Sequence, residues 1–336
     1  MSGMPHAKAL WTDLARRFAH AKALWTDLAR RFGQPTQADA LTAPPWINHP
    51  EAAQILSTAA IDEDIRAAAM DLITKGFTII RGVQDPALCA QTIADYQRYC
   101  AENADYVAQN KDSLGRELRL VNFHHYSDAA LRLGANERIM RILDFAFGAE
   151  AAIYTSLTFK FGTQQPVHRD TPHFATWPDG YFFGVWTALE DIAPEAGPLF
   201  YYEAAHHFEV DAAAIWRHVR QSMPHLSETE QLHQALEIYN GEVISRAPSN
   251  GVNRTAAMRR GDVAIWHPQT PHGGSPASDP MRSRWSIVFH CAPKDKQVHQ
   301  HDAFFRHAGD AEPPPRYGFT EGHGRAVALA GDVAFM

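Results

Sequence analysis

The sequence contains little cysteine. Its three cysteines, Cys89, Cys100 and Cys291, are odd in number and scattered along the chain. Such thiols supply neither a disulfide framework nor the paired C-x-x-C spacing of a structural zinc site. Disulfides accumulate in oxidising compartments, whereas scattered thiols suit a reducing one. We therefore expect a cytoplasmic protein without disulfides.

Long apolar runs and clustered positive charge are also absent. No apolar segment approaches the roughly 20 residues that span a membrane, and the N-terminus lacks the apolar core of a secretion signal. The formal net charge is −7, and the one basic cluster, Arg259-Arg260 with Arg254, is short. Phosphate binding needs more clustered Lys and Arg. We expect a small-molecule substrate and no nucleic-acid or membrane partner; a homo-oligomer is compatible with the composition.

One segment is duplicated. HAKALWTDLARRF occurs at 6–18 and again, unchanged, at 20–32, and a polar, proline-rich linker follows. Structural repeats usually diverge, so identity indicates a recent tandem duplication or a cloning scar; a helical partner-binding arm is the alternative. We interpret 1–50 as an N-terminal helical arm with a linker and 51–336 as a single domain.

The rest of the chain predicts a mainly β protein with helical additions, of the α+β class. The expected elements are helices over 51–75, 85–110 and 128–147 and strands over 76–83 and 118–124. From 152 onward, short β-prone runs alternate with Pro, Gly and Asp, interrupted by helical texture at 211–238. The pattern favours N-terminal helices packed on an antiparallel sandwich or barrel at about 150–292, followed by an irregular tail.

The stretch PVHRDTPHFATW brings His168, Asp170 and His173 close together in sequence. Alternate residues of an extended chain point to the same side, so His168 and Asp170 share a face. Asp170 and His173 would need a helical turn to converge, and Pro172 disfavours helical backbone at the residue before it. The spacing favours His168 and Asp170 as metal ligands; the alternative is a surface histidine beside a turn aspartate.

A second cluster supplies candidates for a third ligand. GDVAIWHPQTPHGG carries His267 and His272, and the glycines after His272 permit a close approach. In the following strand RWSIVFH, Arg284 shares a face with Ser286 and His290. An arginine on an inward strand face needs an anionic partner, and its planar guanidinium suits a carboxylate. Two histidines and one carboxylate with open positions form the facial triad of non-haem Fe(II) oxygenases.

HRD, VWTALEDIAPEAGPL and HGGSPASDPMRSRWSIVFH, in this order over about 76–292, resemble the phytanoyl-CoA dioxygenase family of Fe(II)/2-oxoglutarate oxygenases. The resemblance implies a double-stranded β-helix, or cupin-like jelly roll, and the use of Fe(II), 2-oxoglutarate and O2. It implies His168, Asp170 and His272 as iron ligands, Arg284 on the far carboxylate of 2-oxoglutarate, and Trp186 beside it. The spacing to Arg284 favours His272 over His267.

Other residues near these motifs are further candidates. We assign Gln165, just before the H-x-D motif, and Ser286, on the face of Arg284, to co-substrate binding; structural hydrogen bonding is the alternative. We assign His173 and Trp177 to the substrate pocket, with an exposed loop histidine and a core tryptophan as alternatives.

The sequence departs from the family pattern in two places. YYEAAHH stands where the family commonly has P-G-S-H, and Gly274 stands where it often has Ser. A contact to 2-oxoglutarate is therefore lost or supplied by another residue. Asp170 is retained, whereas related halogenases lack this carboxylate and use the vacated position for chloride, so its presence favours oxygenation.

We therefore expect an Fe(II)- and 2-oxoglutarate-dependent dioxygenase that hydroxylates a C–H bond of a small metabolite or natural-product intermediate. Two alternatives stay open. A zinc-dependent hydrolase could use the same His/Asp/His set, but it leaves Arg284 without a role. A non-catalytic jelly-roll protein could bind a metal or ligand and turn nothing over.

Overall fold

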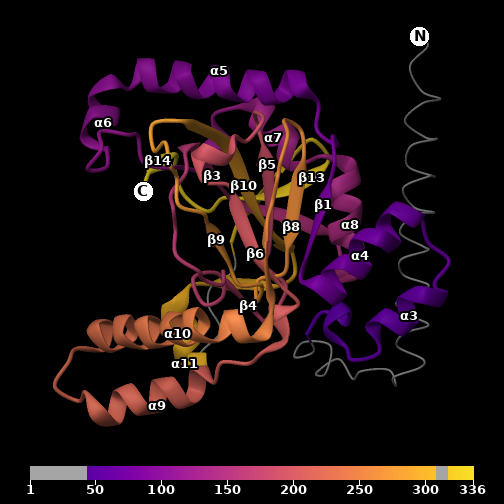
Figure 1. The fold of residues 1–336 in the computed structure, drawn as a ribbon, viewed down its shortest axis with the longest axis vertical. Helices are drawn as coiled ribbons and strands as arrows, with labels where there is room; N and C mark the ends of the chain where they lie inside the picture. Colours follow the sequence, from indigo (N-terminus) through magenta and orange to yellow (C-terminus); the bar gives the residue numbers. More distant parts are fainter. Residues whose placement is uncertain (1–43, 308–316) are drawn as a thin grey trace.

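The computed structural model describes residues 44–307 and 317–336. The duplicated segments at 6–18 and 20–32, and with them most of the expected N-terminal arm, lie outside the described residues. Two facing β-sheets form the centre of the molecule (Figure 1). In Figure 1 helices lie above these sheets and to their right, and a separate helical group lies at the lower left.

Within the described part of the chain, the larger sheet has nine strands. They are β1 Phe77–Ile80, β2 Leu120–Val121, β3 Ala151–Phe161, β5 Phe183–Ala188, β8 Val263–Trp266, β10 Ser283–Pro293, β12 Phe319–Gly322, β13 Arg325–Ala328 and β14 Ala334–Phe335. The order is β1-β8-β5-β10-β3-β13-β12, while β2 pairs with both β3 and β14. The long strand β10 lies between β5 and β3 and pairs antiparallel with both.

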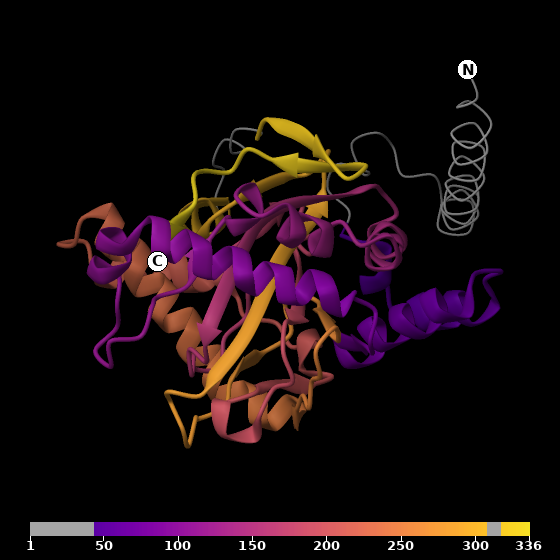
Figure 2. The same ribbon diagram turned by 90° about the horizontal axis from the view of Figure 1, so that it is seen from above.

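The tail after 292, which we expected to be irregular, instead extends this sheet. β13 pairs in parallel with β3, β12 pairs with β13, and β14 pairs with β2. In Figure 2 the yellow C-terminal strands lie along one edge of the molecule. The prediction of an irregular tail was wrong because β12 and β13 bond to each other as a hairpin, while β13 and β14 also pair with β3 and β2, which lie far away in sequence.

The smaller sheet carries part of the candidate site. It consists of β7 Val252–Thr255, β6 Leu199–Glu203 and β9 His272–Gly274, in the order β7-β6-β9. An isolated antiparallel bridge joins His168 to His272 at its edge. Elsewhere, β4 Ala175–Trp177 pairs with β11 Gln297–His299.

Side chains from both sheets pack together in the space between them. This interior includes Trp186, Trp266 and Val288 from the larger sheet and Leu199 and Tyr201 from the smaller one. Two sheets that close over a shared interior form the jelly-roll arrangement that the family resemblance implies.

Helices cover the outer face of the larger sheet. They are α3 Ala52–Thr58, α4 Glu63–Lys75, α5 Pro86–Glu102, α6 Ala104–Gln109, α7 Asp128–Gly134 and α8 Glu137–Phe147. Trp285, Ile287 and Phe289 of β10 belong to the core that these helices share with the sheet, whereas Val288 belongs to the interior. The alternation predicted for the strand RWSIVFH is therefore confirmed.

The helical texture expected at 211–238 forms a separate group with its own apolar core. It consists of α9 Ala212–Ser222, α10 Glu228–Asn250 and α11 His301–His307. A capping box between Ser227 and Glu230 starts α10. The 3-10 turns are η1 Trp46–Asn48, η2 Phe123–His125, η3 Pro194–Ala196 and η4 Ala205–His207.

The structure also bears on two expectations from the sequence, which concern disulfides and membrane-spanning segments. Cys89, Cys100 and Cys291 are free, as expected. No helix within 44–307 or 317–336 is long and apolar enough to cross a bilayer.

The close packing of Gly184 on Trp266 gives a first prediction. A Cβ built at Gly184 would lie 2.2 Å from the indole Cε2 of Trp266, so alanine there must displace the ring. We expect Gly184→Ala to lower the free energy of unfolding by about 1–3 kcal/mol in urea denaturation. A Cβ at Gly241, on the exposed side of α10, meets open space. Gly241→Ala is the matched control and should raise stability by about 0.5–1 kcal/mol. Equal stability of Gly184→Ala and the unaltered protein would contradict this packing.

Candidate metal centre

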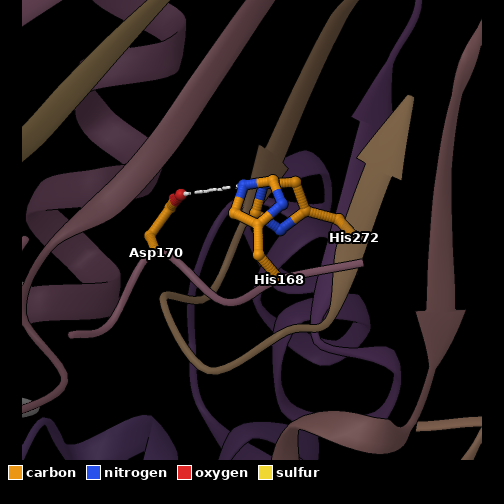
Figure 3. Close-up of side chains that lie close together, drawn as sticks. All are labelled: His168, Asp170 and His272. Carbon is orange, nitrogen blue, oxygen red and sulfur yellow. Dashed lines mark ion pairs between the residues drawn. The ribbon is translucent and has the colours of Figure 1, made fainter. Parts of the chain in front are cut away.

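Two backbone hydrogen bonds bring His168 and His272 together. The N–H of each residue donates to the carbonyl of the other at 2.9 Å. Residues opposite each other in an antiparallel pair project to the same face. The two imidazole rings accordingly lie side by side, with their centroids 4.3 Å apart. Asp170, two residues after His168, points to the same site, as the alternation predicts (Figure 3).

These three side chains form the only cluster of metal-binding residue types found in the described ranges. One ligand atom from each lies within 4.8 Å of the others. Asp170 Oδ1 is 3.6 Å from His272 Nε2 and 4.0 Å from His168 Nε2. Figure 3 shows the carboxylate directed at the two rings. The residues predicted from the sequence are thus brought together, and His267 is not among them.

Backbone carbonyls determine the orientation of both imidazoles. His168 Nδ1 lies 2.9 Å from the Pro166 carbonyl oxygen, and His272 Nδ1 lies 2.9 Å from that of Thr270. A carbonyl can only accept, so each Nδ1 must carry the proton. In the neutral form of each ring, Nε2 then has the lone pair and faces the cluster, which is the arrangement that a metal-binding histidine needs.

The second oxygen of Asp170 is held separately. Trp266 Nε1 donates to Asp170 Oδ2 at 2.6 Å, and His290 Nε2 lies 3.6 Å from the same oxygen. Oδ1 is left to face the two histidines. The carboxylate is therefore positioned to offer one oxygen, rather than two, to a metal.

The protonation states of Asp170 and His168 suit metal binding. Burial would raise the pKa of Asp170, but its interactions with His272 and His290 outweigh burial and hold that pKa well below its usual range. Burial lowers the pKa of His168 to about 3. An ionised carboxylate and a neutral imidazole are the forms that bind divalent metals.

Arg284 and Tyr201 place two hydrogen-bond donors in the same interior. Arg284 is 2% exposed, and its Nη1 donates to the Gly197 carbonyl at 2.9 Å. Its Nε, and the hydroxyl of the fully buried Tyr201, have no hydrogen-bond partner among the described residues. The Tyr201 ring centroid is 6.2 Å from that of His272. Two buried donors without partners, next to a metal-binding cluster, suit an incoming carboxylate.

Burial affects the pKa values of these two donors in opposite directions. It lowers the pKa of Arg284 to about 10, partly offset by Tyr201, so the guanidinium stays charged at neutral pH. It raises the pKa of Tyr201, so the phenol keeps its proton. Both groups therefore remain donors at neutral pH.

Trp266, His290 and Tyr201 were not assigned to the site from the sequence. Alternation within β8 places Trp266 with Ala264 in the interior and Ile265 in the outer core. Alternation alone could therefore have identified Trp266 as an inward residue. The alternation predicted His290 on the same strand face as Arg284, but no sequence pattern indicated that its side chain would reach Asp170.

The other residues assigned to co-substrate lie near this interior. Trp186, 2% exposed, packs in the same interior cluster as Tyr201. Ser286 is fully buried, and its hydroxyl donates to the Arg284 carbonyl at 3.2 Å. The half-buried Gln165 accepts from the Gly274 N–H at 3.0 Å through its main-chain carbonyl. Their roles at the co-substrate stay predictions.

The structure also accounts for glycine at position 274. A Cβ built at Gly274 would lie 3.2 Å from both the Cα and the nitrogen of Gln164. The segment before the H-x-D motif thus packs so closely on β9 that a larger residue would push it away.

The residues assigned to substrate lie after the H-x-D motif. The chain turns at 171–173 despite Pro172, with the Phe174 N–H bonded to the Asp170 carbonyl at 2.9 Å. The turn leaves His173 half-buried and outside the metal-binding cluster. Trp177 is 43% exposed in β4. Their contact with substrate stays a prediction.

Comparison with known families identifies this arrangement. The family model for phytanoyl-CoA dioxygenase (PhyH) matches residues 73–284, more than half of the chain. The chain belongs to the phytanoyl-CoA dioxygenase family. The matched region contains His168, Asp170, His272 and Arg284, so the resemblance inferred from the motifs is confirmed. No curated protein matches the chain.

Several solved structures with a similar fold have TM-scores above 0.5. The epimerase SnoN, in complex with Fe3+, alpha-ketoglutarate and nogalamycin RO, has a TM-score of 0.55 and 16% identity, covering 80% of this chain and 97% of its own. EctD from S. alaskensis with bound Fe has a TM-score of 0.54 and 16% identity, and the match covers 74% of this chain and 85% of EctD. The carbocyclase SnoK from nogalamycin biosynthesis has a TM-score of 0.53 and 15% identity, and the match covers 76% of this chain and 94% of SnoK. These similarities support the predicted fold class.

The bond between Trp266 and Asp170 gives a second prediction. Trp266→Phe keeps an aromatic ring but removes the N–H that holds Oδ2, so the carboxylate can rotate. Loss of such an outer partner typically weakens metal binding by about 10–100-fold. We expect an increase of this order in the dissociation constant for Co(II), measured by absorbance titration. Trp285→Phe, on the outer face of β10, is the control and should bind as the unaltered protein does. Unchanged affinity in a folded Trp266→Phe protein would show that this bond does not position the ligand.

Proposed function

We propose that the protein is an Fe(II)- and 2-oxoglutarate-dependent oxygenase that hydroxylates a C–H bond of a small metabolite or natural-product intermediate. The observation that carries the proposal is the meeting, in one barrel interior, of a His/Asp/His cluster and two donor groups without a partner among the described residues, Arg284 Nε and the Tyr201 hydroxyl. Membership of the phytanoyl-CoA dioxygenase family supports it.

The donor set fits iron. Two neutral imidazoles and one carboxylate, with the remaining positions open, are the ligands of non-haem Fe(II) oxygenases. Asp170 contributes a single oxygen because Trp266 occupies the other. His168, Asp170 and His272 would hold the metal from one side and leave the other side for co-substrate.

The interior also fits 2-oxoglutarate. Arg284 Nε and the Tyr201 hydroxyl would donate to its far carboxylate, which supplies the partners that both lack. Trp186, Leu199 and Val288 surround this region with apolar groups that exclude water. Iron with bound 2-oxoglutarate and dioxygen supplies oxidative decarboxylation to succinate and the oxidation of a substrate C–H bond.

Hydroxylation is the finer part of the proposal. Asp170 keeps the ligand position that chloride takes in related halogenases, which favours oxygen transfer to the substrate. The similar solved structures include an epimerase and a carbocyclase as well as EctD with bound Fe. The product must therefore be identified by experiment.

The third prediction tests the metal and the co-substrate together. Anaerobic addition of Fe(II) and 2-oxoglutarate to the apoprotein should produce a visible charge-transfer band. His272→Ala should abolish the band, whereas His125→Ala, at an exposed position, should leave it unchanged. A zinc hydrolase would form no such band, and a non-catalytic protein that forms it would release no succinate with any substrate.

The fourth prediction isolates Arg284. Arg284→Met keeps a long side chain but removes the charge-assisted donors, each worth about 1.5–3 kcal/mol. We expect the dissociation constant for 2-oxoglutarate to rise about tenfold to a hundredfold, with metal affinity unchanged. Arg282→Met, two residues earlier and exposed, is the matched control. If Arg284→Met binds 2-oxoglutarate as the unaltered protein does, Arg284 is not the anchor.

A further inference from the structure

A cavity of about 630 Å³ lies behind the metal-binding segment. Its walls come from η1, β4 and the loop after it, η4, α10, α11, β11 and the loop between β8 and β9. The segment 208–212 also lines it and contributes the carboxylates of Glu209 and Asp211. His168, Asp170 and His272 do not line it, but Arg169 does. Successive side chains of an extended segment point to opposite sides. The cavity is therefore on the face of this segment opposite the metal cluster.

Arg169 brings a positive charge to this cavity without an acidic partner. The residue is 1% exposed, and its Nη2 donates to the carbonyls of Ala205 at 3.1 Å and Phe208 at 2.7 Å. Its guanidinium lies 3.9 Å from the centroid of the Phe208 ring. Its guanidinium also interacts with the Tyr239 hydroxyl, and its Nε has no hydrogen-bond partner in the described part of the protein. A buried charge of this kind is stabilised when an anion joins it.

Asp179 places a carboxyl group at the same cavity. It follows β4 and lines the cavity wall. The side chain is accessible, yet the surrounding protein desolvates it enough to raise its pKa to about 7, with no positive group counteracting the shift. Tyr239 of α10, 2% exposed, interacts electrostatically with both Arg169 and Asp179. The two opposite charges thus share one region, although they do not neutralise each other.

A neutral donor also reaches this wall. His267 Nδ1 accepts from the Gln269 N–H at 3.1 Å, so the proton is on Nε2. That Nε2 has no hydrogen-bond partner in the described ranges, and the residue is 3% exposed. Burial holds the pKa of His267 well below its usual value, so the ring stays neutral. His267, the rejected candidate for the third metal ligand, therefore faces this cavity.

We propose that this cavity binds a small zwitterion of the amino-acid or short-peptide class, with its carboxylate on Arg169 and its ammonium group on Asp179. Each protein charge then gains the partner that the fold does not provide, and His267 adds a neutral hydrogen bond. The volume lies within the range of about 300–1,000 Å³ that is usual for small-molecule sites. The inference goes beyond the proposed oxygenase function and does not depend on it, because no metal ligand contributes to the cavity.

The test uses the full chain and defined probes. Pools of the standard amino acids and of dipeptides are screened by saturation-transfer NMR, and each binder is compared with its C-terminal amide and its N-acetyl derivative. Loss of either charge should weaken binding about tenfold or more, since a charged hydrogen bond contributes about 1.5–3 kcal/mol. Asp179→Asn should weaken zwitterion binding equally. Asp105→Asn, on the exposed surface of α6, is the control and should have no effect.

A further variant separates this site from the metal centre. Binding should persist in His272→Ala, so that failure of the proposed oxygenase function would leave this result intact. The proposal is overturned if no pool binds, if the amide and N-acetyl derivatives bind as tightly as the zwitterion, if Asp179→Asn binds as the unaltered protein does, or if His272→Ala abolishes binding. Asp179 is accessible, so its substitution is not expected to impair folding, whereas a variant of the buried Arg169 could.

Discussion

The antiparallel bridge between His168 and His272 is the constraint on which the candidate site depends. Its two backbone hydrogen bonds place the Cα atoms of both histidines opposite each other, whatever the surrounding side chains are. Because each side chain's direction follows from the strand geometry, the rings need only small adjustments to face one metal position. Carbonyl oxygens of the same backbone then select the tautomers. The main chain thus supplies most of the preorganisation.

The same bridge gives the segment 168–170 two different sides. His168 and Asp170 face an interior with Trp266 and Tyr201 in its walls, whereas Arg169 faces the helical group around α10. Charges on both sides lie among buried groups, where electrostatic interactions are stronger than in water. The two sides share this short backbone segment, but no side chain of the metal-binding cluster lines the cavity on the other side.

The sequence predicted those features that depend on residues close together in the chain. Alternation assigned the faces of RWSIVFH, and the spacing of His168 and Asp170 indicated a shared direction. The order of motifs typical of the family indicated His272 and Arg284. The structure places His272 in the cluster, and Arg284 is buried with its Nε lacking a partner among the described residues.

The remaining features depend on contacts between distant segments. Tyr201 and Trp266 enter the site because the two sheets close on each other, and no short pattern encodes that distance. In the C-terminal tail, β13 and β14 pair with β3 and β2, which lie far away in sequence. The sequence did not predict the turn at 171–173. Pro172 disfavours helical backbone at the residue before it, but the hydrogen bond from the Phe174 N–H to the Asp170 carbonyl still closes a turn.

Gly184 and Trp266 are in such close contact that a larger residue at one position requires a smaller one at the other. The indole occupies the space that a side chain at position 184 would need, and from there it reaches Asp170. A relative with a larger residue at 184 would need a smaller ring at 266, and its carboxylate would then need another donor. The identities of these two residues can thus indicate, in any related sequence, whether the metal-binding carboxylate is held in the same way.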